Sequence, residues 1–344
     1  MTPERLVDRN PRLSAVELAA RFAPPPRFSA VRFDTFAPNP EHPSQADART
    51  ELERFALEVS EPAPSTGGWR LFGRRTPAPG AVTTRPGRYL DGGFGVGKTH
   101  LLASLWHAAP SPKAYVTFES LTAVIGFLGM AEAVRTFVGY RLLCIDEFEL
   151  DDVANTLMTV TFLRAVIAEG VKVAATSNSI PDRLGEGRFN AEDFRREIAA
   201  ISGHFDALRI DGPDYRATSR PARTEALEPG AVEGLARASA GAVTLDAFGD
   251  LLAHLRRVHP VQFGGLLDGV DTVLVTGMQP IENQGSALLF VQLVDELYDA
   301  EVVFGATGCD VTAVFPESYR HGGFRKKYGR CESRLAAMLA EAAR

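Results

Sequence analysis

A short glycine-rich stretch at residues 92–99 has the residue types and spacing of a phosphate-binding loop, G-x-x-x-x-G-K-[ST]. Glycines let backbone N–H groups approach phosphate oxygens without a Cβ in the way, and the helix that follows points its positive end at them. We therefore expect Lys98 on the β- and γ-phosphates of ATP and Thr99 as a ligand of Mg²⁺. The predicted ATP-binding residues are Gly92, Gly93, Phe94, Gly95, Val96, Gly97, Lys98, Thr99 and His100.

Polar residues end two later apolar runs, and their order suggests ATP hydrolysis. Asp146 and Glu147 follow Leu-Leu-Cys-Ile, where an aspartate can order the Mg²⁺ shell and a glutamate can act as general base. Thr99 and Asp146 are thus the predicted metal ligands. Asn178 ends the next run and is predicted to hold the attacking water or sense the γ-phosphate. The alternatives are acids at a helix N-terminus and, for Asn178, a cap on the turn before Pro181.

Charge on the transferred phosphoryl group also requires a positive side chain, which a neighbouring subunit can supply as an arginine. Such an arrangement would tie hydrolysis to assembly, so a homo-oligomer is expected. Arg334, near the end of the chain, is predicted to act in cis. For each arginine a surface salt bridge is the alternative. The candidates to act in trans are Arg188, Arg195, Arg196 and Arg216.

The elements around these residues alternate between apolar strands and helices. This rhythm predicts an α/β fold of the P-loop NTPase, AAA+-like type, with a mostly parallel sheet flanked by helices. Further expected elements are an extended segment at 28–36 and helices at 44–58 and 332–343. The core elements are strands at 88–93, 113–120, 141–148, 171–178, 271–278 and 301–308, and helices at 98–109, 152–170 and 282–300.

Two breaks in composition divide the chain. Residues 59–87 are rich in proline, glycine and threonine, and residues 217–236 are polar. We expect an N-terminal region with its connection at 1–87, a P-loop ATPase core at 88–216 and a second α/β lobe at 217–344. The second lobe repeats the strand–helix–strand spacing of the first, which either a duplication or two generic βαβ units would explain.

Bulk composition excludes several classes of protein. The net charge of -6 argues against a strongly basic nucleic-acid binder. The three cysteines have no disulfide or zinc-site spacing, which favours a reducing compartment. No apolar run of transmembrane length occurs and the first residues do not read as a secretory signal, so a cytoplasmic protein is expected.

Several segments together resemble the ZapE family, AAA+-like ATPases of bacterial cell division that are related to a mitochondrial ATPase of protein quality control. The resemblance runs from about FDTF to SRLAAM and covers most of the chain. The segments are GGFGVGKTHLL, LLCIDEFELDD, VAATSNSIPDRLGEGRF, IDGPDYR, LVDELYD and SRL.

The resemblance implies roles and partners beyond those that the residues themselves suggest. Lys98 and Thr99 fall on the Walker A motif of the family, Asp146 and Glu147 on its Walker B motif, and Asn178 on its sensor position. Arg334 falls on a recurring Ser-Arg-Leu. The family is associated with FtsZ at the inner face of the cytoplasmic membrane, so division-ring remodelling and peripheral membrane association are the implied properties.

This chain departs from the family pattern in one place and leaves one other function open. The part between the phosphate-loop helix and LLCIDEF is short, as in the version from high-GC Gram-positive bacteria, so partner contacts of the longer insertion are in doubt. An AAA+ nucleic-acid motor or helicase-loader-type ATPase is the alternative function. The acidic net charge disfavours it, and no stable nucleic-acid complex is expected. Glu147 argues against a binding switch without turnover.

Overall fold

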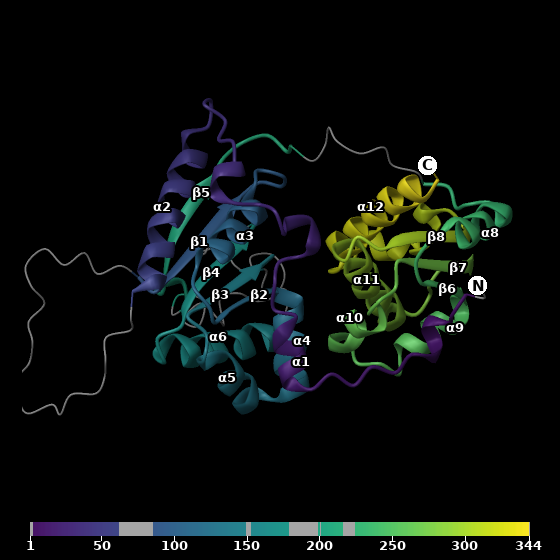
Figure 1. Ribbon diagram of the computed structural model, residues 1–344, viewed down its shortest axis with the longest axis horizontal. Helices are drawn as coiled ribbons and strands as arrows, with labels where there is room; N and C mark the ends of the chain where they lie inside the picture. The colour runs from purple at the N-terminus through teal and green to yellow at the C-terminus, as the bar shows by residue number, and fades with distance from the viewer. Residues whose placement is uncertain are drawn as a thin grey trace, which may run out of the picture. The chain divides into compact units, whose positions relative to one another are not determined.

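The chain folds into two compact units, seen in the computed structural model of Figure 1. The structure describes residues 3–61, 85–148, 153–178, 199, 201–215 and 224–343. Unit 1 comprises residues 1–18, 25–29 and 218–344, and unit 2 comprises residues 19–24 and 30–217.

Unit 2 is built on a five-stranded parallel sheet with the order β2-β3-β4-β1-β5. Because β4 lies between β1 and β3, residues that follow these three strands meet at one edge of the sheet. The strands are β1 (Gly87–Gly92), β2 (Lys113–Thr117), β3 (Leu142–Asp146), β4 (Lys172–Ser177) and β5 (Phe205–Ile210).

Helices cover both faces of this sheet, since every residue of β1 and of β3 is buried. One group, α2 and α3, packs together and contacts the sheet, while α4, α5 and α6 pack against one another as a second group. The expected P-loop NTPase fold with a parallel sheet and flanking helices is therefore confirmed. The helices are α2 (Pro43–Ser60), α3 (Lys98–Ala108), α4 (Phe118–Leu128), α5 (Met130–Val138) and α6 (Val153–Ala168).

Unit 1 contains a three-stranded parallel sheet with the order β6-β7-β8. Its core is aliphatic and aromatic, with Phe248, Phe290 and Phe304 fully buried. The strands are β6 (Val243–Ala247), β7 (Thr272–Met278) and β8 (Val303–Gly308), and the helices are α8 (Pro229–Ala238), α9 (Phe248–Leu255), α10 (Phe263–Leu266), α11 (Gln284–Asp299) and α12 (Arg325–Ala342).

The first residues of the chain belong to unit 1, which corrects the expected N-terminal region at 1–87. Glu4 forms a parallel bridge with Thr244 beside β6. The buried carboxylate of Asp246 accepts hydrogen bonds from the backbone of Leu6 at 2.8 Å and of Val7 at 3.4 Å. These hydrogen bonds attach the segment to residues about 240 positions later in the chain. Helix α2, which also lies within residues 1–87, belongs to unit 2 instead. The second division falls at residue 218, next to the expected boundary at 217.

Three expected elements differ from the structure. Residues 28–36 are not extended but contain the 3₁₀ turns η2 (Pro26–Phe28) and η3 (Phe33–Thr35), the first with proline at its start. The strand expected at 113–120 ends at Thr117, whose Oγ1 caps helix α4 by accepting from the Ser120 N–H. The last helix begins at Arg325 rather than at 332.

Helix α1 (Ala15–Ala20) is short and buries Leu18. Among the residues that the structure describes, no single helix is long and apolar enough to span a membrane. Only α4 and α5 taken together meet that test, across a bend of 119°.

A fully buried arginine joins α2 to strand β1 of the unit 2 sheet. The Arg88 side chain is 0% exposed and donates to Glu51 at 2.7 Å and to Glu58 at 3.2 Å. Its guanidinium also lies 4.3 Å from the ring centre of Phe55. Removing a buried charge from such a network leaves carboxylates without their buried partner, which is strongly destabilising.

Arg88→Met should therefore lower the free energy of unfolding by about 3 kcal/mol, measured by urea unfolding followed through the fluorescence of Trp106 on α3. Arg54→Met is the matched control, because Arg54 bonds the same two glutamates, Glu51 and Glu58, but is 50% exposed. Its cost should be under about 1 kcal/mol. Equal effects of the two substitutions would show that burial of Arg88 adds nothing.

Candidate functional site

The predicted phosphate loop connects the end of β1 to the start of α3. Gly95 and Gly97 have φ values of +69° and +98°, the left-handed region that glycine enters without strain. At Gly92 a Cβ would lie 2.2 Å from the carbonyl oxygen of Ile210 on β5, so a side chain there has no room. The backbone thus has the shape that the motif requires, with a strand before the loop and a helix after it. The loop N–H groups and the positive N-terminal end of α3 can both face a phosphate.

The ammonium of Lys98 is held inside this loop. Lys98 is only 8% exposed, and its Nζ donates to the carbonyl oxygens of Gly92 at 2.8 Å and Gly93 at 2.5 Å. It also donates to Oδ1 of Asn178 at 3.0 Å. The structure therefore brings two predicted residues together, although they stand 80 positions apart in the chain.

The two predicted metal ligands are neighbours as well. The Thr99 hydroxyl donates to Oδ1 of Asp146 at 3.3 Å. Both side chains offer oxygen ligands, which Mg²⁺ prefers, and the hydroxyl lone pairs of Thr99 stay available when its proton points at the carboxylate. The donor set at the loop therefore fits Mg²⁺ bound together with a nucleotide. In the described parts of the chain no group of three or more His, Cys, Asp or Glu residues could hold a metal ion.

Two hydroxyl groups that the motif search did not assign also bond Asp146. Tyr115 on β2 donates to Oδ2 at 2.8 Å, and Thr176 on β4 donates to Oδ1. The available signal was a tyrosine inside an apolar strand, because a buried tyrosine hydroxyl usually needs a partner. Sequence alone did not say which partner.

Glu147 has an unusual backbone. Its φ is +54°, which is rare for a residue with a side chain and costs of order 1–3 kcal/mol, a form of strain found at functional sites. Its N–H donates to Oγ1 of Thr176 at 3.0 Å and to Oδ1 of Asp146 at 3.1 Å. This conformation turns the chain sharply after β3, so that Glu147 is half-buried while Phe148 is buried. Asp151 and Asp152, which directly precede α6 in the sequence, lie outside the described residues.

Residues before α2 and after β5 line the loop from outside. The ring of Phe36 approaches Gly97 so closely that a Cβ there would lie 2.6 Å from it, and a Cβ at Gly95 would collide with Asp214. Predicted residue His100 lies against Thr35, with its Nε2 3.0 Å from the Thr35 hydroxyl. Burial lowers the pKa of His100, which favours the neutral ring. Phe94 is 56% exposed at the loop tip.

A buried carboxylate stands directly before the loop. Asp91 ends the apolar part of β1 and accepts a hydrogen bond from Arg209 on β5 at 3.1 Å. Burial raises the pKa of Asp91, although Arg209 and Lys98 act in the opposite direction. Its position suggests that it anchors β5 to β1 where the loop begins.

Cys144 is a free cysteine in the core of unit 2. It is fully buried on β3, where burial raises the pKa of its thiol well above the ordinary value.

Of the predicted arginines, the structure describes only Arg334. Arg334 lies on α12 in unit 1, where it pairs with Asp295 at 2.5 Å and stacks over the ring of Tyr298 at 5.0 Å. Its catalytic role therefore remains a prediction. Arg188, Arg195, Arg196 and Arg216 lie outside the described residues.

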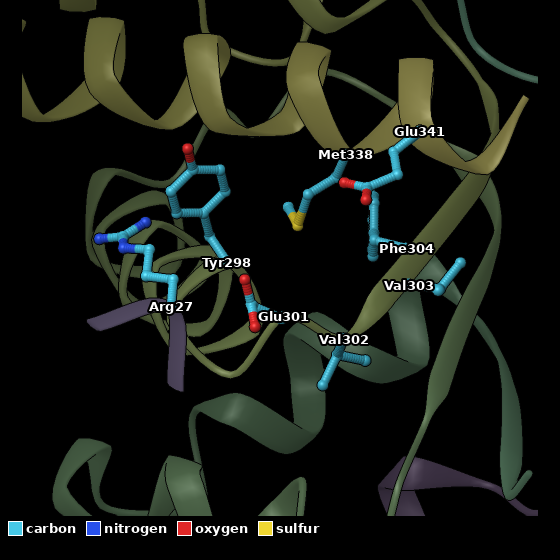
Figure 2. Close-up of a pocket in the computed structure, with 8 residues that line it drawn as sticks. All are labelled: Arg27, Tyr298, Glu301, Val302, Val303, Phe304, Met338 and Glu341. Carbon is cyan, nitrogen blue, oxygen red and sulfur yellow. The ribbon is translucent and has the colours of Figure 1, made fainter. Parts of the chain in front are cut away.

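A small pocket in unit 1 lies near the same tyrosine (Figure 2). Arg27 reaches it and bonds Asp299 at 2.7 Å with its guanidinium 4.7 Å from the ring centre of Tyr298. The pocket contains no residue of the predicted site. It is lined by Arg27, Tyr298, Glu301, Val302, Val303, Phe304, Met338 and Glu341.

A family model described as AFG1-like ATPase matches residues 32–231 and 219–343. The chain belongs to the AFG1-like ATPase family. The match includes the loop at residues 92–99, the acids at the end of β3 and the polar end of β4, so the expected family resemblance is confirmed.

This AFG1-like chain is also similar to individual proteins. It is 31% identical over 192 residues to the cell division protein ZapE of Escherichia coli K12, covering 50% of this chain and 51% of that protein. The same values hold for ZapE of Escherichia coli O157:H7. The chain thus spans about half the length of the curated relatives it matches.

Among solved structures, AMPPCP-bound DnaA from Aquifex aeolicus is 13% identical, with a TM-score of 0.39, covering 53% of this chain and 50% of that one. The DnaC helicase loader is 17% identical, with a TM-score of 0.37, covering 54% and 99%. Scores this low add nothing to the fold of the AFG1-like chain described above.

Proposed function

We propose that this chain hydrolyses ATP to ADP and phosphate and uses the energy to remodel the FtsZ division ring. One observation supports the ATPase proposal most strongly. Lys98, Thr99, Asp146 and Asn178 come from three segments and are linked by hydrogen bonds at the carboxyl ends of β1, β3 and β4. Ligands of open α/β sheets bind at this end of the strands.

Each residue then has a definite task. Lys98 exchanges loop carbonyl oxygens for β- and γ-phosphate oxygens, and the backbone amides of residues 93–98 bind the remaining phosphate oxygens. Thr99 and Asp146 would hold Mg²⁺, which when bound offsets charge on the phosphates. Glu147 accepts the proton of the attacking water, which Asn178 orients. Loss of a positioned base typically costs about 10²–10⁴-fold in rate.

The division-ring part of the proposal rests on similarity to a cell division protein and on the family resemblance. It includes a homo-oligomer in which an arginine of one subunit completes the site of the next, at the inner face of the membrane. A protein that stays strictly monomeric with ATP bound, by light scattering, would contradict this arrangement.

Phosphate release by the full-length chain tests the proposal. Turnover should require Mg²⁺, stop with EDTA and rise several-fold when polymerised FtsZ is added, and ATP should shorten the polymers. Single-stranded DNA should leave the rate unchanged. A steep, salt-dependent stimulation by single-stranded DNA would instead support a nucleic-acid motor or helicase loader.

A further inference from the structure

Two hydroxyl groups from neighbouring strands converge on one carboxylate. Asp146 ends β3, with β2 on one side of it and β4 on the other. The Tyr115 hydroxyl donates to Oδ2 at 2.8 Å, and the Thr176 hydroxyl donates to Oδ1. The three side chains belong to residues that are 7% exposed or less, so water does not compete for these bonds.

The strand register explains why these hydroxyls reach Asp146. Thr117 is the partner of Asp146 in the β2–β3 ladder, so Tyr115 lies two residues back on the same face and its long side chain extends toward the strand end. On the other side Ile145 pairs with Ala175, so Asp146 and Thr176 occupy the next position along both strands. The carboxylate is thus enclosed by the sheet itself.

The two bonds fix the rotation of the carboxylate. The terminal torsion of an aspartate is otherwise soft. With Tyr115 on Oδ2, the other oxygen, Oδ1, must face Thr99, whose hydroxyl is 3.3 Å away. Thr99 then directs its proton at Asp146 and its lone pairs at the position that the proposed ion would take. Hydrogen bonds to a charged acceptor are strong enough to hold this orientation.

We propose that Tyr115 is a positioning residue for metal binding: its hydroxyl holds Asp146 in the rotation in which Oδ1 faces Thr99, so that Thr99 presents its lone pairs to Mg²⁺. Thr176 shares this role and has a second one, because its Oγ1 also accepts the N–H of Glu147 at 3.0 Å. This inference rests on the proposed ATPase function. Partners of this kind behind metal ligands typically contribute about 10–100-fold in metal affinity or activity.

The two hydroxyls therefore have separable effects. Tyr115→Phe removes one hydroxyl and keeps the ring, so it should weaken metal binding while the maximal rate at saturating Mg²⁺ stays within about 3-fold of the wild type, since Glu147 keeps its support. Thr176→Val should weaken metal binding and also lower the maximal rate. Thr176→Ser keeps the hydroxyl and should restore both.

Metal binding is measured directly, with Mn²⁺ as the probe. The full-length chain is saturated with a non-hydrolysable ATP analogue, and free Mn²⁺ is followed by electron paramagnetic resonance. Tyr115→Phe should raise the Kd for Mn²⁺ about 10–100-fold and shift the Mg²⁺ dependence of phosphate release to match. Tyr89→Phe is the matched control, because Tyr89 is also buried, on β1, and should leave the Kd unchanged.

The outcomes separate this inference from the proposed function. A wild-type Kd in both Tyr115→Phe and Thr176→Val overturns the positioning role, whether or not the protein is an ATPase. If Asp146→Asn leaves Mn²⁺ binding unchanged, the metal site itself is wrong and both proposals fail. If Tyr115→Phe unfolds, as circular dichroism would show, the contrast between Thr176→Val and Thr176→Ser decides: equal Kd values for these two variants overturn the inference.

Discussion

Lys98→Ala is expected to weaken ATP binding by at least about 100-fold, because two or more charge-assisted hydrogen bonds of about 1.5–3 kcal/mol each are lost. The Lys98 ammonium is enclosed by the loop, 2.8 Å from the Gly92 carbonyl oxygen and 3.0 Å from Asn178. Because Lys98 is only 8% exposed, a cation from the solvent should not take the place of the ammonium that the substitution removes. Titration with a fluorescent ATP analogue measures the effect.

Lys113→Ala is the matched control for this substitution. Lys113 lies beyond the other end of α3, where its ammonium donates to the carbonyl oxygen of Ala109 at 2.7 Å and covers the ring of Trp106. Losing this charge should reduce stability slightly and leave ATP affinity unchanged. If Lys98→Ala binds ATP as tightly as Lys113→Ala does, the phosphate loop is misassigned.

Glu147→Gln is expected to lower kcat by about 10²–10⁴-fold while ATP still binds. The amide keeps the size of the side chain and the backbone N–H that bonds Thr176, but it cannot accept a proton. Glutamine has the same branching as glutamate, so the positive φ at position 147 should cost the same in both proteins. Single-turnover phosphate release and analogue titration together separate chemistry from binding.

Glu169→Gln serves as the control for charge alone, because Glu169 is exposed just beyond the end of α6. It should turn over ATP like the wild type. Unchanged turnover in Glu147→Gln would show that another group is the base. Because Glu147→Gln should bind ATP without hydrolysing it, this variant can also be used to isolate the proteins that bind the ATP-bound state.

The parts of the site that are contiguous in the chain were predictable from sequence. The loop at residues 92–99 and the pair Asp146–Glu147 are each made of neighbouring residues. Such motifs can be recognised without knowledge of how the strands are arranged. The meeting of Lys98 with Asn178 was anticipated only as a general feature, because it depends on β4 lying beside β1. Spacing alone does not determine strand order.

Contacts made across strands were not predictable in the same way. Tyr115 looked like any aromatic residue in a buried strand, and its bond to Asp146 follows from the β2–β3 register. The placement of Asp214 beside Gly95 needs the path of the chain after β5. The prediction of an extended segment at 28–36 was wrong, because Phe28 and Phe33 lie in short 3₁₀ turns and not in a strand of a sheet.

The attachment of residues 4–7 to β6 has a consequence for synthesis. A ribosome delivers unit 2 completely before the strands of unit 1 exist, since unit 2 ends at residue 217. Glu4 and Leu6 therefore emerge long before Thr244 and Asp246, the groups that bind them. Domains fold as units during translation. Unit 2 can therefore fold first, and Glu4 and Leu6 form their contacts only after residues 244–246 have been synthesised.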